Sequence, residues 1–161
     1  SKIKNELILA LTVFSGSSGL AGGQYFDLAL ENKKISKKKI IDIQRNKTGK
    51  LFAFCCESAG FIKGQNFYKR KILKKIGLDI GLLFQITDDL IDFKGDSKIV
   101  GKPTKSDKKK GKQTLVKLLG YKETLNFANN LKKKINMKIK KYGIKSYDLI
   151  QSVEFILKRD F

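Results

Sequence analysis

An acidic stripe on one helix is the stretch of this sequence best suited to chemistry. Its polar members are Gln85, Asp88, Asp89 and Asp92. They recur at helical spacing late in an apolar-periodic run from Phe67 to Phe93, which predicts one helix with these side chains on a single face. Apolar residues supply the expected buried flanks, and these are Leu82, Leu83, Ile86, Leu90 and Ile91.

The charges of this stripe oppose stability. The carboxylates repel one another, and they lie near the expected end of the helix, where the helix dipole disfavours negative charge. A cation should therefore gather here, and Mg²⁺ is the natural candidate because it combines one or two protein carboxylates with water and substrate phosphates. The alternative is a solvated acidic face.

Two shorter stretches place polar side chains on otherwise apolar helices. Gln24 and Asp27 lie three residues apart on one face, although a cap or turn explains this spacing equally well. Lys47 and Thr48 lie in a buried helix, and Lys47 should face a carboxylate or phosphate because lysine is almost never fully buried without a partner. Gly49 costs about 1 kcal/mol in mid-helix unless another backbone approaches closely.

An irregular loop is expected between residues 94 and 112. Its Gly-Asp and Gly-Lys pairs are Gly95-Asp96, Gly101-Lys102 and Gly111-Lys112. Such a loop can bring one or two lysines to an anion, but solvated loops have the same composition.

The elements that must position these residues are helical. The chain has 161 residues, enough for one domain with a core, and its single proline and long apolar-periodic runs favour an all-α fold. Expected helices lie near 2–14, around Gln24, from Ser36 as N-cap to about 59, over 67–93, and near 121–142 and 146–158, with Gly143 as the stop between the last two.

The net charge of +20 comes almost entirely from lysine, since only Arg45, Arg70 and Arg159 are arginines. Solvated lysine faces explain this excess better than nucleic acid, because no recognised binding module with interleaved aromatic residues is present. Binding to nucleic acid or to anionic lipid is the competing hypothesis, and it predicts salt-dependent binding that is indifferent to loss of Asp88.

Two features bear on the compartment. Residues Leu7 to Phe26 carry no charge, yet small and polar residues interrupt them, and this favours a buried core helix that ends or kinks rather than a membrane span. Cys55 and Cys56 are adjacent on a helix, which suits neither a mutual disulfide nor a zinc site, and we expect buried thiols in a reducing cytoplasm.

Taken together, these stretches resemble the C-terminal half of the trans-isoprenyl diphosphate synthases, the polyprenyl synthetases that include farnesyl and geranylgeranyl diphosphate synthase. The matching stretches, in order, are Gly-Gly-Gln24-x-x-Asp27, Lys47-Thr48-Gly49, Phe84-Gln85-x-x-Asp88-Asp89-x-x-Asp92, Gly95-Asp96, Gly101-Lys102, Asp107 and Gly111-Lys112-x-Thr114. Ordered matches across nearly the whole chain make this resemblance more specific than a lone aspartate motif.

The resemblance implies an all-α, isoprenoid-synthase-type antiparallel helical bundle, with residues 1–161 as the C-terminal part of a single domain. It implies a cytoplasmic, Mg²⁺-dependent homodimer that joins an allylic diphosphate to isopentenyl diphosphate by ionisation, condensation and elimination. Asp88, Asp89 and Asp92 would then be metal ligands. Lys47, Lys102 and Lys112 would contact diphosphate. Lys47, Thr48 and Gln85 would be the catalytic residues, with Gln24 in a looser supporting role.

The resemblance also has a gap, because the family's first aspartate-rich motif has no counterpart before Gln24. We therefore expect this chain to be inactive alone. It would be a fragment of a short-chain prenyl diphosphate synthase or, alternatively, a noncatalytic partner subunit that binds diphosphate or a full-length synthase. Neither nucleic-acid binding nor stable membrane insertion is expected.

Overall fold

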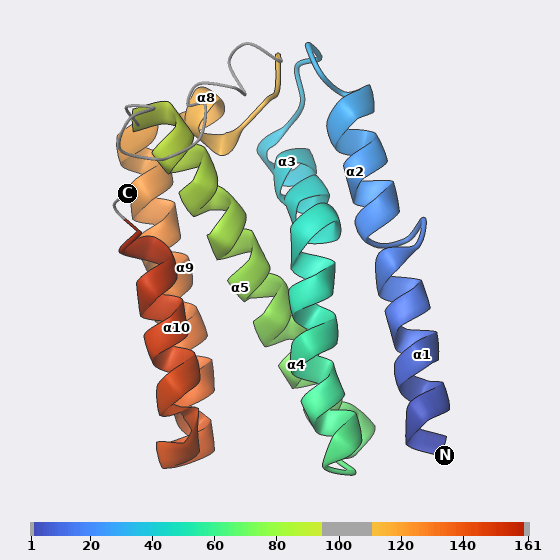
Figure 1. The fold of residues 1–161 in the computed structure, drawn as a ribbon. Helices are drawn as coiled ribbons and strands as arrows, with labels where there is room; N and C mark the ends of the chain where they lie inside the picture. The colour runs from blue at the N-terminus through green and yellow to red at the C-terminus, as the bar shows by residue number, and fades with distance from the viewer. Residues whose placement is uncertain (1, 95–110, 160–161) are drawn as a thin grey trace. The chain divides into compact units, whose positions relative to one another are not determined.

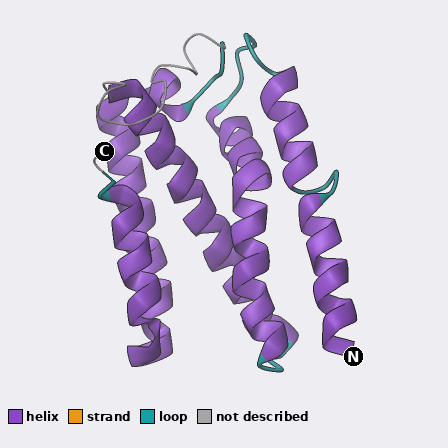
Figure 2. Ribbon diagram, in the orientation of Figure 1, coloured by secondary structure: helices purple, strands orange, loops and turns teal. Residues whose placement is uncertain are grey.

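Helices form every regular element in the residues that the computed structural model describes, which are 2–94 and 111–159 (Figures 1 and 2). The elements are α1 Lys2–Ser15, α2 Leu20–Ala29, α3 Lys37–Gln44, η1 Arg45–Gly49, α4 Lys50–Ile62, α5 Phe67–Lys94, α8 Leu115–Leu119, α9 Tyr121–Ile139, η2 Lys140–Ser146 and α10 Tyr147–Leu157. The expected all-α fold is confirmed. The chain forms two compact units, Ser1–Asp27 with Ile41–Leu82, and Leu28–Ile40 with Leu83–Phe161.

In the first unit, α1 packs along α4, with the Phe14 ring 6.2 Å from the ring of Phe54. The helix that begins after Ser36 continues through η1, a π-helical turn, into α4. Ser36 caps its start as expected, since its hydroxyl accepts a hydrogen bond from the backbone N–H of Lys39.

Backbones approach closely where η1 meets α5. A Cβ added to Gly81 would lie 2.5 Å from the Cα of Gly49, and one added to Gly77 would collide with the backbone of α4 at Ala53. Another backbone therefore approaches Gly49 closely, which is the condition under which a glycine was expected in the middle of a helix. The absence of side chains here lets the first half of α5 lie directly against η1 and α4.

In the second unit, α9 and α10 form an antiparallel helical hairpin (Figure 1). The expected stop at Gly143 is confirmed, because its φ of +72° breaks the helix within η2. Glu154 links the two helices: it accepts hydrogen bonds from Lys132 Nζ at 2.9 Å and from Asn136 Nδ2 at 2.6 Å. The Lys132 hydrogen bond is the main reason that the pKa of Glu154 lies below its ordinary 4.5, although burial opposes this.

Two expectations about burial are wrong. Lys2–Ala29 is, by length and composition alone, able to cross a membrane, but a turn after Ser15 divides it, as the small residues predicted. Most of its large apolar side chains are not buried, however: Phe14 is, but Ile8 and Leu9 are 62% and 67% exposed, because α4 covers only one face of α1.

The cysteines also differ from expectation. Cys55 is exposed and only Cys56 is partly buried, because consecutive side chains on a helix point in different directions. Burial, and to a smaller extent the neighbouring Cys55, raises the pKa of Cys56 to about 11, which leaves its thiol protonated. Both thiols are free, as expected.

We predict that Gly81→Ala lowers the free energy of unfolding by about 1–3 kcal/mol, because the new methyl group must displace the backbone at Gly49. Urea denaturation followed by circular dichroism measures the change. Asn130→Ala, at an exposed position of α9, is the control and should change stability by less than about 0.5 kcal/mol. Equal effects of the two substitutions would contradict the close packing.

We predict that the hydrogen bonds of Glu154 stabilise the hairpin at neutral pH and cease to do so in acid. The pKa of Glu154 is lower in the folded than in the unfolded chain, so its contribution is present above pH 4.5 and is lost as the pH falls through the folded value. Unfolding measured from pH 7 downward should show a smaller acid-dependent loss for Glu154→Gln than for the unmodified protein. A parallel loss in both would contradict the link.

Candidate functional site

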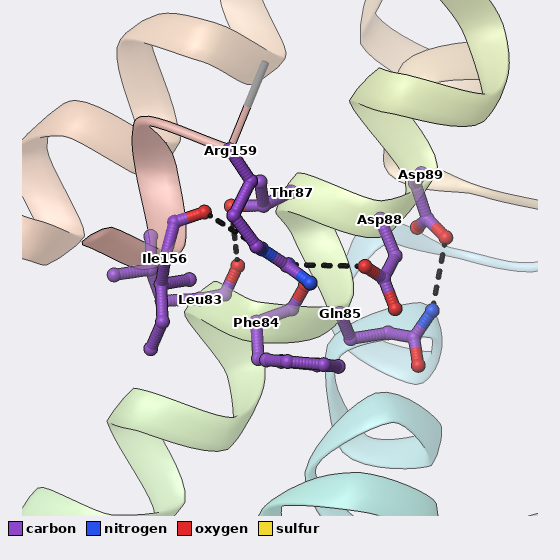
Figure 3. A network of polar contacts seen from close by, with 8 residues as sticks. All are labelled: Leu83, Phe84, Gln85, Thr87, Asp88, Asp89, Ile156 and Arg159. Carbon is purple, nitrogen blue, oxygen red and sulfur yellow. Dashed lines mark hydrogen bonds and ion pairs between the residues drawn. The ribbon is translucent and has the colours of Figure 1, made fainter. Parts of the chain in front are cut away.

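The acidic stripe lies on the second half of α5, within the second unit (Figure 3). Asp89 and Asp92 are buried, with 5% and 8% exposure, whereas the side chain of Asp88 is 26% exposed. Gln85 Nε2 donates a hydrogen bond to Asp89 Oδ1 at 3.1 Å. The predicted helix from Phe67 to Phe93 is confirmed, and so the stripe occupies one stretch of continuous helix.

The opposite side of this stretch anchors it in the core. Leu83 and Ile86 are fully buried and Leu90 is 5% exposed, which confirms these expected flanks, whereas Ile91 is only partly buried. Thr87 is buried as well, and its hydroxyl donates to the carbonyl of Leu83. This packing fixes the rotation of α5 and thereby the direction of its carboxylates.

A residue that sequence reasoning missed reaches the stripe from beyond α10. Arg159 donates from a terminal guanidinium nitrogen to Asp88 Oδ1 at 3.0 Å, and its side chain is only 11% exposed. The guanidinium carbon lies 4.2 Å from the centre of the Phe84 ring. The only signal in the sequence was that this residue is one of three arginines among many lysines.

The carboxylates of the stripe do not form a complete protein cage for a metal ion. Among the described residues, no three His, Cys, Asp or Glu side chains converge as a set of metal ligands. Mg²⁺ does not need such a set, since it is commonly held by one or two carboxylates together with water and substrate phosphates. The Arg159 guanidinium already places a positive charge against Asp88. The oxygen donors of Asp88, Asp89 and Asp92 are of the type that Mg²⁺ prefers, and a cation at Asp88 would compete with this guanidinium.

A second polar site lies in the first unit at η1. Lys47 Nζ contacts Asp27 Oδ2 at 2.9 Å, and the two side chains are 13% and 15% exposed. The expectation that Lys47 faces a carboxylate is confirmed. Gly23 allows this contact, because α2 passes so close to η1 that a Cβ at this position would collide with the backbone of Lys47.

The remaining predicted residues are distributed as follows. Thr48 is partly buried in η1, and Gln24 is exposed on α2. Lys112 is partly buried before α8, and its backbone carbonyl accepts a hydrogen bond from Lys117 Nζ. Lys102 and Asp107 lie outside the described residues. The structure thus joins Lys47 with Asp27 in one unit, and Gln85, Asp88 and Asp89 in the other.

Comparison with known proteins decides the family. The sequence profile of the polyprenyl synthetase family matches residues 2–149. This chain belongs to the polyprenyl synthetase family. The farnesyl diphosphate synthase of Micrococcus luteus is 36% identical over 130 residues, which are 81% of this chain and 45% of that protein.

Solved structures of polyprenyl synthetases have the same fold. An FPP/GFPP synthase from Zymomonas mobilis matches with a TM-score of 0.82 and 35% identity, over 96% of this chain and 51% of the other. A geranyltransferase from Helicobacter pylori, complexed with magnesium and isoprenyl diphosphate, matches with a TM-score of 0.82 and 26% identity, over 98% and 52%. The chain spans about half the length of the relatives it matches.

We predict that the mostly buried ion pair of Lys47 and Asp27 in this polyprenyl synthetase chain is strongly coupled. Asp27→Asn should destabilise the fold by about 3 kcal/mol, because it leaves the Lys47 ammonium buried without its carboxylate. Lys47→Met combined with Asp27→Asn should recover part of this loss. A double-mutant cycle in urea measures the coupling, and a value below about 0.5 kcal/mol would contradict a direct interaction.

Proposed function

We propose that this chain supplies one half of a short-chain prenyltransferase, which condenses an allylic diphosphate with isopentenyl diphosphate to give a farnesyl or geranylgeranyl diphosphate. The observation that carries the proposal is the acidic stripe of Asp88, Asp89 and Asp92. The chain that bears it belongs to the polyprenyl synthetase family and is similar to farnesyl diphosphate synthases. In this proposal residues 1–161 form the C-terminal part of one synthase domain, in a cytoplasmic homodimer.

The chemistry requires stabilisation of a leaving anion. The bond between the allylic carbon and oxygen breaks, diphosphate departs with the electron pair, and an allylic cation remains. That cation forms a carbon–carbon bond with isopentenyl diphosphate, and loss of a proton restores a double bond. Cations aimed at the departing oxygens lower the barrier most, because charge develops there in the transition state.

The proposed roles follow from the side chains. Lys47, Lys102 and Lys112 bind diphosphate oxygens. Lys47 is held by Asp27 in the chain as it stands, so its ammonium is already ordered before an anion arrives.

Thr48 and Gln85 offer oxygen dipoles to the allylic cation, and they are too weakly nucleophilic to trap it. Asp88, Asp89 and Asp92 would hold Mg²⁺, which acts as a Lewis acid on the diphosphate when bound. The Helicobacter pylori relative is described as complexed with magnesium and isoprenyl diphosphate, which supports a role for magnesium in this proposal.

A second candidate is a noncatalytic partner subunit, which binds diphosphate or a full-length synthase without turnover. The observation behind it is that this chain spans about half the length of its relatives. Both candidates predict that the 161-residue chain has no activity by itself. They differ in whether the full-length protein that contains it turns over substrate.

We predict that Asp88→Ala in the full-length protein lowers prenyl transfer by about 10²–10³-fold, because the proposed Mg²⁺, which would stabilise the leaving diphosphate, loses one of its ligands. The assay supplies isopentenyl and dimethylallyl diphosphates with Mg²⁺ and measures prenyl diphosphate products. Asp148→Ala, at an exposed position of α10, is the matched control and should retain activity.

The outcomes separate the candidates. Activity in the full-length protein that is lost only in Asp88→Ala supports the prenyltransferase. Absence of turnover together with binding of a full-length synthase would favour the partner subunit. Equal activity in Asp88→Ala and Asp148→Ala would contradict the role of the stripe.

A further inference from the structure

Arg159 is fixed by more than its ion pair with Asp88 (Figure 3). Its Nε donates to the carbonyl of Ile156 at 3.1 Å, and a terminal nitrogen lies 3.4 Å from the carbonyl of Phe84. The planar guanidinium also lies against the Phe84 ring, 4.2 Å from its centre, where a cation is favoured. The guanidinium therefore keeps its place if the carboxylate of Asp88 turns to another ligand.

This immobility changes the electrostatics of Asp88. A side chain held only by an ion pair would swing away when a metal ion replaced it. Arg159 instead stays beside the carboxylate as a permanent positive charge, and with 11% exposure it is poorly screened by solvent. A bare divalent cation at Asp88 is repelled by this charge, whereas a cation that carries a diphosphate has a net negative charge and is attracted.

We propose that Arg159 is a positioning residue that makes Asp88 select a divalent cation bound to diphosphate over the bare cation. The proposal rests on the proposed function, since it takes Asp88 as a metal ligand. It goes further because it specifies the order of binding: the divalent cation binds at the stripe together with diphosphate and not before it. The guanidinium sets this preference through Asp88 and needs no contact with the reacting carbon.

The chain offers a matched control. Arg45 makes the same kind of pair with another aspartate of α5, because its terminal nitrogen lies 2.9 Å from Asp79 Oδ1. Arg45→Gln and Arg159→Gln remove the same net charge, but only Arg159 pairs with a residue of the stripe. A difference between the two variants therefore reports on position and not on the total charge of the protein.

The experiment titrates the full-length protein with Mn²⁺ and follows the free ion by electron paramagnetic resonance, first alone and then with inorganic diphosphate. Arg159→Gln should lower the dissociation constant of bare Mn²⁺ by about tenfold and leave that of Mn²⁺ with diphosphate unchanged or raised, so that the preference for the complex collapses. Arg159→Lys retains the charge and should keep most of the preference. Arg45→Gln should match the unmodified protein.

Each alternative result has a distinct meaning. Unchanged Mn²⁺ binding in Arg159→Gln, or equal tightening in Arg45→Gln, would overturn the proposal while the metal site itself stands. Asp88→Asn tests that site separately, and an unchanged number and affinity of bound Mn²⁺ ions in this variant would contradict the proposed function. Circular dichroism identifies a variant that fails to fold, in which case Arg159→Met against Arg45→Met, which also remove the charge, carries the same comparison.

Discussion

Burial of negative charge on α5 is the constraint on which the second unit depends. Asp89 and Asp92 are less than a tenth exposed and lie within five residues of Asp88 on one helix. Carboxylates taken out of water are costly unless hydrogen bonds or opposite charges replace the lost hydration. Gln85 on the same helix supplies a hydrogen bond to Asp89, and Arg159 beyond α10 supplies a positive charge to the neighbouring Asp88. The α9–α10 hairpin is therefore a support of the stripe as well as a packing layer.

In the first unit, the buried charge that needs a partner is positive instead of negative. Lys47 is mostly buried, and Asp27 supplies its counter-charge across a contact that is possible only because α2 approaches η1 so closely. Small residues thus have an electrostatic consequence: Gly23 and Gly49 bring backbones together, and the side chains that remain polar find partners. Packing and charge are coupled in both units, and each unit holds its polar residues in defined positions before any ligand arrives.

Sequence periodicity predicted α5 and its stripe because the apolar flanks recur over many turns. A carboxylate partner for Lys47 was predicted because a lysine on a buried helix is unfavourable without an opposite charge. Arg159 was missed because it lies 71 residues from Asp88 in the sequence, and local sequence patterns do not predict a contact over that separation. The short helix α8 was missed for a different reason: five residues are too few to establish a period. Burial of α1 was overestimated because the uncharged, apolar run was interpreted as a core helix, whereas α4 covers only one face of it.

The π-helical turn at η1 has a consequence for how this region is compared between sequences. A π-helical turn contains one residue more than an α-helical turn, so the faces of α3 and α4 are out of phase across Arg45–Gly49. An amphipathic pattern counted through the turn would assign the residues of α4 to the wrong side. The wide turn takes up the extra residue within Arg45–Gly49, so α4 keeps the orientation that an uninterrupted α-helix without that residue would give it.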